Sequence, residues 1–170
     1  MNYHNITHDD MLNGEGLRVV LWVSGCTHNC KGCHNPQTHS SSSGVPFDDK
    51  AKDEIFEQLD KDYISGITFS GGDPLHEENL EDIYRLIKYI KKRYGESKTI
   101  WIYSGYKLED IMSDKTIANT TESYRNFLRR NIIKSSNVFV DGRFVEDLKD
   151  EQYHWAGSTN QRVLRKDIDF

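Results

Sequence analysis

All three cysteines of this 170-residue chain lie within one short stretch, at Cys26, Cys30 and Cys33. Their spacing, C-x3-C-x2-C, allows a single loop to wrap three thiolates around one metal centre. A structural zinc site would need a fourth ligand, whereas a [4Fe-4S] cluster held by three thiolates keeps one iron open to chelate a small molecule. Neighbouring histidines that could complete a zinc site are His28, His34 and His39. The spacing favours the iron-sulfur centre and leaves zinc as an alternative.

The bulk composition narrows the chemistry that these thiols can do. With 36% hydrophobic and 29% charged residues, the chain is typical of one globular domain that spans residues 1–170. A net charge of -5 argues against nucleic-acid binding. The sequence has no apolar run long enough to span a membrane and no signal-peptide pattern at its start, so we expect a cytoplasmic protein. In a reducing compartment, cysteines are metal-binding or catalytic more often than bridged.

Strands and helices are expected to alternate along the chain. Apolar, β-branched stretches predict buried strands at residues 16–25, 64–72, 98–106 and 136–142. Apolar residues at helical spacing predict helices at residues 47–59, 79–94 and 121–133. This alternation is typical of βαβ units and a parallel sheet, with a short edge strand added at residues 161–165.

Each of the four predicted parallel strands ends in small or polar residues. Examples are Ser70-Gly71-Gly72 and Ser104-Gly105. Ligands of parallel α/β sheets bind at the carboxyl ends of the strands, so these loops should converge on one site together with the cysteine loop. Four strands are too few for an eight-stranded barrel, and the length fits an open, partial barrel better.

The cysteine motif at the end of the first strand, followed by Gly-Gly-Asp-Pro at the end of the next, resembles the radical S-adenosylmethionine (SAM) enzymes. Five stretches between residues 13 and 162 together resemble the activating enzymes of the anaerobic, class III ribonucleoside-triphosphate reductases. They are "NGEGLRVVLWVSGCTHNCKGCHNP", "FSGGDPL", "IWIYSGY", "VDGRF" and "GSTNQR". The resemblance implies an α/β fold of minimal size, an open parallel β/α barrel of the radical SAM type.

The same resemblance implies an oxidoreductase activity and two cofactors. A [4Fe-4S] cluster would cleave SAM reductively, and the 5'-deoxyadenosyl radical would generate a glycyl radical on the anaerobic reductase. The reductase and an electron donor such as flavodoxin are the implied partners. Two other functions remain open: a radical SAM enzyme acting on a small nucleoside-like substrate, and a non-catalytic zinc or iron-sulfur module.

Roles for individual residues follow from the motifs. The three cysteines would hold three irons of the cluster. Gly71 and Gly72 would let the backbone approach the methionine amino group of SAM, whose charge Asp73 would balance.

Further contacts to SAM are expected around these motifs. The backbone near Gly32 or the ring of His34 would contact adenine, because glycine stands where many radical SAM enzymes carry an aromatic residue. Ser104 and Asp141 would face the ribose or a bound cation. The segment "GSTNQR" would either dock the reductase or form a polar turn. The basic runs 91–93 and 129–130 are interpreted as solvated helix ends, or as a docking site for an acidic electron donor.

Overall fold

The computed structural model describes residues 1–113 and 120–170. Its centre is a seven-stranded sheet with the strand order β3-β1-β2-β4-β5-β6-β7. The strands are β1 (Asn2–Asp10), β2 (Leu17–Val23), β3 (Val45–Pro46), β4 (Ile64–Gly71), β5 (Thr99–Tyr103), β6 (Val138–Asp141) and β7 (Arg162–Arg165). With β3 and β7 at its two edges, the sheet is open.

The middle of the sheet is parallel. Strands β2, β4, β5 and β6 pair in parallel, in that order. Strands β1, β3 and β7 pair antiparallel at the edges. The prediction of an α/β fold with four buried parallel strands is therefore confirmed, and so is the edge strand after them. The carboxyl ends of the four parallel strands lie at one edge of the sheet, where the predicted loops can meet.

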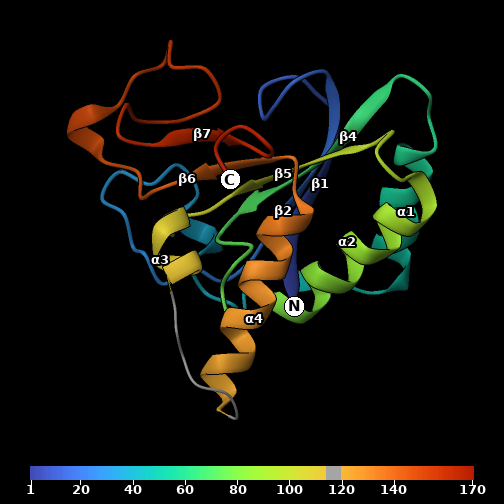
Figure 1. Cartoon of the computed structure of the whole chain (residues 1–170), viewed down its shortest axis with the longest axis horizontal. Coiled ribbons are helices and arrows are strands. Elements are labelled where there is room, and N and C mark those ends of the chain that lie inside the picture. Colours follow the sequence, from blue (N-terminus) through green and yellow to red (C-terminus); the bar gives the residue numbers. More distant parts are fainter. Residues whose placement is uncertain (114–119) are drawn as a thin grey trace.

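The helices α1 (Asp49–Leu59), α2 (Leu80–Tyr94) and α4 (Thr121–Ser135) follow the predicted ranges within a few residues. The Asp48 side chain begins α1 by accepting a hydrogen bond from the Ala51 N–H at 2.9 Å. Figure 1 shows these three helices gathered on one side of the sheet. In residues 1–113 and 120–170, no helix has both the length and the apolar character required to cross a membrane.

The two faces of the sheet differ in character. Toward the helices, Leu21, Phe69 and Ile102 are fully buried in the main hydrophobic core. On the other face, Arg18 is fully buried, and its Nε donates to Thr68 Oγ1 at 2.8 Å. Its guanidinium carbon also lies 5.4 Å from the Trp101 ring centroid, and burial lowers the pKa of Arg18 to about 10. On this face Thr68 Oγ1 donates to the Asn13 carbonyl at 2.7 Å and Arg18 Nη1 donates to the Glu15 carbonyl at 3.0 Å, so polar side chains of the sheet position the loop before β2.

Three elements were not predicted. Strand β1 places only Ile6 in the core, so its sequence has no apolar alternation to reveal it, and it is defined by pairing with β2. Strand β3 has two residues, and helix α3 (Leu108–Ser113) has six. The structure also contains two short 3₁₀ turns, at Pro36–Thr38 and Glu146–Leu148.

One prediction about surface charge was wrong. Arg129 is only 8% exposed and is not a solvated helix end. Its Nε donates to the Leu75 carbonyl oxygen at 3.1 Å, and its guanidinium carbon lies 5.0 Å from the Tyr106 ring centroid. The helical face that carries it packs against the loops after β4 and β5, a contact that the local sequence does not reveal.

Candidate functional site

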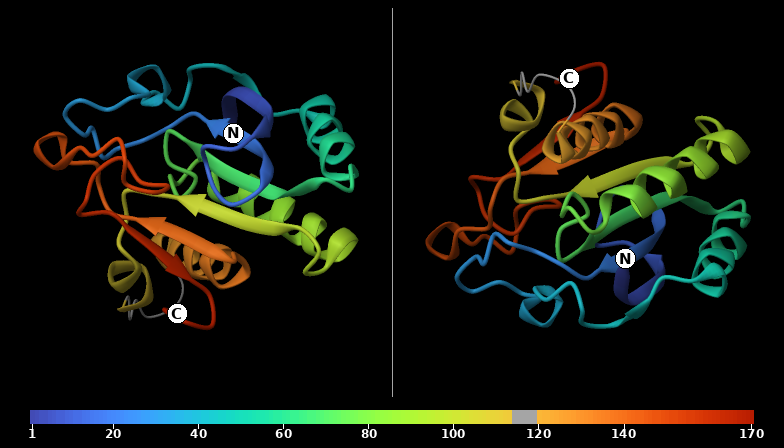
Figure 2. Two further views of the ribbon diagram at one scale, coloured as in Figure 1. Left: turned by 90° about the horizontal axis from the view of Figure 1, so that it is seen from above. Right: turned by 90° about the horizontal axis from the view of Figure 1, so that it is seen from below.

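A pocket of about 330 Å³ lies where the loops after β2, β4, β5 and β6 meet. The loop that carries the cysteines and the segment after β6 lie at the same end of the sheet, as the two views of Figure 2 show in light blue and in orange to red. Eight of the nine predicted site residues line this pocket: Cys26, Cys30, Cys33, His34, Gly71, Gly72, Asp73 and Ser104. Gly32 is the exception.

The three thiols are free and partly buried. Burial raises the pKa of the Cys26 thiol to about 11, although the backbone N–H groups of His28 and Asn29 oppose the shift. Burial also raises the pKa of Cys30, opposed most strongly by the backbone N–H of Phe144. In the metal-free chain these two thiols are therefore protonated at neutral pH, and metal binding must release their protons.

The donor set fits an iron-sulfur cluster. Three thiols open onto one pocket, and the backbone N–H of Asn35 donates to Cys33 Sγ at 3.4 Å, a contact that stabilises charge on sulfur. Among the described residues, no three His, Cys, Asp or Glu side chains are grouped closely enough to hold one metal ion. The thiols that bind a cluster lie further apart than the ligands of a single metal ion, since each thiolate binds a different iron.

Asp73 lies at the centre of a buried hydrogen-bond network. Its Oδ1 accepts from the Leu75 N–H at 2.8 Å, and its Oδ2 accepts from the Gly105 N–H at 3.1 Å. The Ser104 hydroxyl lies 2.9 Å from both oxygens, and His28 Nε2 lies 2.7 Å from Oδ2. One carboxylate therefore joins the loops that follow β2, β4 and β5.

The two glycines before Asp73 bring the turn close to the cysteine loop. A Cβ on Gly72 would lie 2.6 Å from the Gly25 carbonyl oxygen and 3.0 Å from that of Thr38. Gly71 has a φ of +106°, and a Cβ there would meet the backbone of Val23 at 2.6 Å. Both glycines thus let the turn pack closely against the end of β2 and the cysteine loop, while their contact with the cofactor stays a prediction.

We expect Gly72→Ala to disturb this packing. Since the obstructing atoms are backbone, the cysteine loop must shift, at a cost of about 1 to 3 kcal/mol. Urea unfolding of the iron-free chain should show a lower midpoint, and iron content after anaerobic reconstitution should fall. As a control, Gly95→Ala strains a left-handed φ of +58° but its Cβ meets nothing within 4 Å, so it should keep its iron even if it lowers the urea midpoint. Full iron content in Gly72→Ala would contradict the packing argument.

Gly32 does not line the pocket, and its backbone conformation is one that favours glycine. Its φ is +70°, a left-handed conformation that favours glycine, and a Cβ there would lie 2.7 Å from Glu146 Oε1. Next to it, Lys31 Nζ pairs with Glu146 Oε2 at 3.0 Å. The cysteine loop is therefore joined on its outer side to the segment after β6.

Two further motifs form structural contacts near the pocket. Asp141 is buried and accepts hydrogen bonds from Arg162 and from the Leu108 N–H at 2.8 Å, and it does not line the pocket. The Gln161 side chain accepts from the Gly157 N–H at 2.9 Å and donates to the Gly142 carbonyl at 2.9 Å. The segment "GSTNQR" thus forms the polar turn that was one of its two interpretations.

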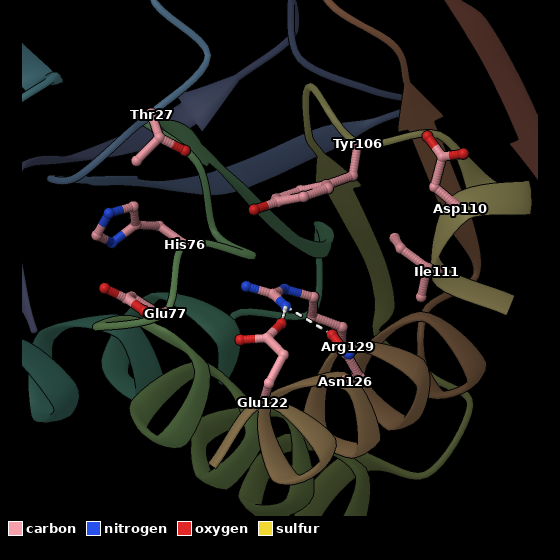
Figure 3. Close-up of a pocket in the computed structure, with 9 residues that line it drawn as sticks. All are labelled: Thr27, His76, Glu77, Tyr106, Asp110, Ile111, Glu122, Asn126 and Arg129. Atoms are coloured by element: carbon pink, nitrogen blue, oxygen red, sulfur yellow. Dashed lines mark hydrogen bonds and ion pairs between the residues drawn. The ribbon is translucent and has the colours of Figure 1, made fainter. Parts of the chain in front are cut away.

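A second pocket of about 430 Å³ adjoins the cysteine loop at Thr27 (Figure 3). Figure 3 shows Arg129 joined to Glu122 and Asn126 by hydrogen bonds of 3.0 and 2.7 Å, below the ring of Tyr106. This pocket is larger than the first, but no cysteine lines it. Because the three thiols that can bind a metal centre all line the smaller pocket, that pocket is the candidate site.

Several pocket residues were missed from the sequence. His28 was considered only as a zinc ligand, yet its Nε2 points at Asp73. Arg143, Phe144 and Gln161 also line the pocket, from the segment after β6. The motifs "VDGRF" and "GSTNQR" mark these stretches, but only the fold brings them to the cysteines.

Comparison with known proteins agrees with this site. A family model described as a 4Fe-4S single cluster domain matches residues 12–164. The anaerobic ribonucleoside-triphosphate reductase-activating protein of Escherichia coli K12 is 41% identical over 165 residues, which cover 96% of this chain and 97% of that protein. The chain belongs to the family of anaerobic ribonucleoside-triphosphate reductase-activating proteins.

More distant members of this activating-protein family match over similar lengths. The Pasteurella multocida protein is 37% identical over 167 residues, covering 97% of this chain and 98% of its own length. The protein of enterobacteria phage T4 is 38% identical over 163 residues, covering 96% of this chain and 93% of its own length. Both matches cover nearly the whole of this chain and most of each relative.

Proposed function

We propose that this chain activates an anaerobic ribonucleoside-triphosphate reductase as a radical SAM enzyme. The observation that carries the proposal is that all three cysteines line one pocket with the Gly71-Gly72-Asp73 turn, in a chain whose relatives are named for this activation. The whole chain would act as a single radical SAM domain. Its open sheet with four parallel central strands would be the minimal form of the partial barrel.

Cys26, Cys30 and Cys33 would hold the [4Fe-4S] cluster through three of its irons. When bound and reduced by an external electron donor, the cluster would supply the electron for the reductive cleavage of SAM to methionine and a 5'-deoxyadenosyl radical, which would take a hydrogen atom from a glycine Cα of the reductase. The protein's own residues bind and orient the reactants and exclude water from the pocket.

The other lining residues would orient SAM. The Gly71-Gly72 turn would receive the amino group of SAM, and the charge of the buried Asp73 behind the turn would stabilise it. His34 and Ser104 line the same pocket and would contact the nucleoside part. The His34 ring packs at 5.4 Å against Phe144, which supports a fixed orientation for the imidazole.

The reductase would reach the pocket past the loops that surround it. The "NGEG" loop and the "GSTNQR" turn supply Asn13, Gly157 and Gln161 to the pocket lining, so the glycine-bearing segment of the reductase would enter there. An electron donor such as flavodoxin would serve the cluster from the cytoplasm. Neither nucleic acid nor membrane is part of the proposed cycle.

The proposal is tested by mixing the reconstituted chain with the reductase, SAM and a reductant under anaerobic conditions. We expect the EPR doublet of a glycyl radical on the reductase, which depends on both SAM and the reductant. A reductase that stays EPR-silent while SAM is consumed would contradict the proposed function.

A further inference from the structure

The histidine inside the cysteine motif is bound to the turn after β4. His28 lies midway between Cys26 and Cys30, and its Nε2 is 2.7 Å from Asp73 Oδ2. The two side chains are only 6% and 2% exposed. A carboxylate accepts hydrogen bonds, so Nε2 is the protonated nitrogen and donates. The middle of the metal-binding motif therefore has a buried, charge-assisted contact with the sheet.

The acceptor of this bond is itself rigidly held. The backbone N–H groups of Leu75 and Gly105 and the Ser104 hydroxyl all donate to the Asp73 carboxylate. These donors come from the loops after β4 and β5, and the Asp73 N–H donates to the Gly25 carbonyl at 2.8 Å, so the turn is also joined to the start of the cysteine loop. His28 thus adds a second attachment, between the middle of the cysteine loop and this turn.

Packing confines the imidazole on its other sides. The Tyr106 ring meets it edge-on, with ring centroids 4.7 Å apart and an interplanar angle of 77°. A Cβ on Gly105 would lie 2.4 Å from His28 Cδ2, so the backbone itself lies against the ring. Figure 3 shows Tyr106 between Thr27 of the cysteine loop and Arg129 of α4. The wall between the two pockets therefore includes His28 and Tyr106.

We propose that His28 is a positioning residue, which acts through Asp73 to order the cysteine loop before any iron binds. The inference rests on the proposed function in one respect, the assignment of the cysteines as cluster ligands. Anchoring the residue between Cys26 and Cys30 holds both thiols toward the pocket. A site ordered in advance avoids the entropy cost of ordering the loop on binding, and so retains its cluster longer.

The test compares two substitutions of similar size. His28→Gln keeps an amide N–H that can donate to Asp73, whereas His28→Leu fills similar space without a donor. The matched control is His8→Ala, because His8 makes the same kind of contact with Glu54, at 2.8 Å, but with both side chains about 40% exposed. Each full-length, iron-free chain is treated with trypsin, and cleavage after Lys31 is followed by mass spectrometry. The Lys31 side chain is 87% exposed and lies inside the loop.

We expect cleavage after Lys31 to be about tenfold faster in His28→Leu, the factor that corresponds to losing one charge-assisted hydrogen bond. His28→Gln and His8→Ala should stay within about twofold of the wild type. Cleavage after Lys149, outside the loop, should be equal in all chains. After reconstitution, a chelator should remove iron from His28→Leu about tenfold faster than from His28→Gln.

Equal cleavage after Lys31 in His28→Leu and the wild type would overturn the inference. An equally large rise in the rate of cleavage after Lys149 in His28→Leu would also overturn it, because it would indicate general unfolding. So would a rate of iron removal that is the same in His28→Leu and His28→Gln. Failure of the proposed function would be seen separately, in the wild-type chain mixed with the reductase, because the proteolysis uses the iron-free chain alone.

Discussion

We expect alanine at Cys26, Cys30 or Cys33 to abolish the reductive cleavage of SAM, and each single substitution should be sufficient. The chain has three cysteines in all, so no other thiol can replace a lost ligand. The fourth iron of the proposed cluster is the one that SAM would occupy. A cluster held by two thiolates would therefore lose both its hold on the protein and the site at which SAM binds.

The measurement is the yield of 5'-deoxyadenosine by chromatography after incubation with SAM and dithionite, together with iron and sulfide content. Lys31→Ala is the matched control within the same loop, because it removes only an exposed ion pair with Glu146. We expect wild-type product from the control and none from the cysteine variants. Wild-type product from any single cysteine variant would show that the ligand assignment is wrong.

Asp73→Asn is the second substitution with a large expected effect, although it hardly changes the shape of the side chain. Backbone N–H groups donate to both carboxylate oxygens, from Leu75 to Oδ1 and from Gly105 to Oδ2. In either orientation of the asparagine amide, its NH₂ group would face one of these N–H groups. A buried donor opposite a buried donor costs on the order of 3 kcal/mol, and the negative charge is lost as well.

The free energy of unfolding of the iron-free Asp73→Asn chain, measured in urea, should fall by about this amount, and the reconstituted chain should retain less iron. Asp49→Asn is the control. That aspartate is 91% exposed and pairs with Lys52 in the first turn of α1, so its replacement should lower the urea midpoint far less than Asp73→Asn does. A stable Asp73→Asn chain with full iron content would show that the network does not organise the loop.

The central sheet could be predicted because its strands are buried on both faces. Residues such as Val19, Ile67 and Phe139 give continuous apolar runs that few other structures produce. Strand β1 has no such run, since Ile6 is its only buried residue and its pairing partner lies elsewhere in the chain. A strand of this kind is defined by pairing with its neighbours, and a local sequence pattern does not reveal it.

In the candidate site, too, the local motifs could be predicted from the sequence and the long-range contacts could not. The cysteine spacing and the Gly-Gly-Asp turn are local, and the structure brings both to one pocket. The contact between His28 and Asp73 joins residues 45 positions apart, and the sequence offers no sign of it. Gly32 shows a further limit, because its left-handed φ of +70° is set by the loop's backbone and is not visible in the motif, while its contact with adenine stays a prediction.

The most direct test of the account follows one hydrogen atom. The reductase is prepared with glycine deuterated at Cα and is incubated anaerobically with the reconstituted chain, SAM and a reductant, and the 5'-deoxyadenosine is analysed by mass spectrometry. We expect one deuterium in the 5'-deoxyadenosine, together with a glycyl radical on the reductase. Unlabelled 5'-deoxyadenosine formed while an added nucleoside is consumed would contradict it, because the radical would then act on a small molecule instead of on the reductase.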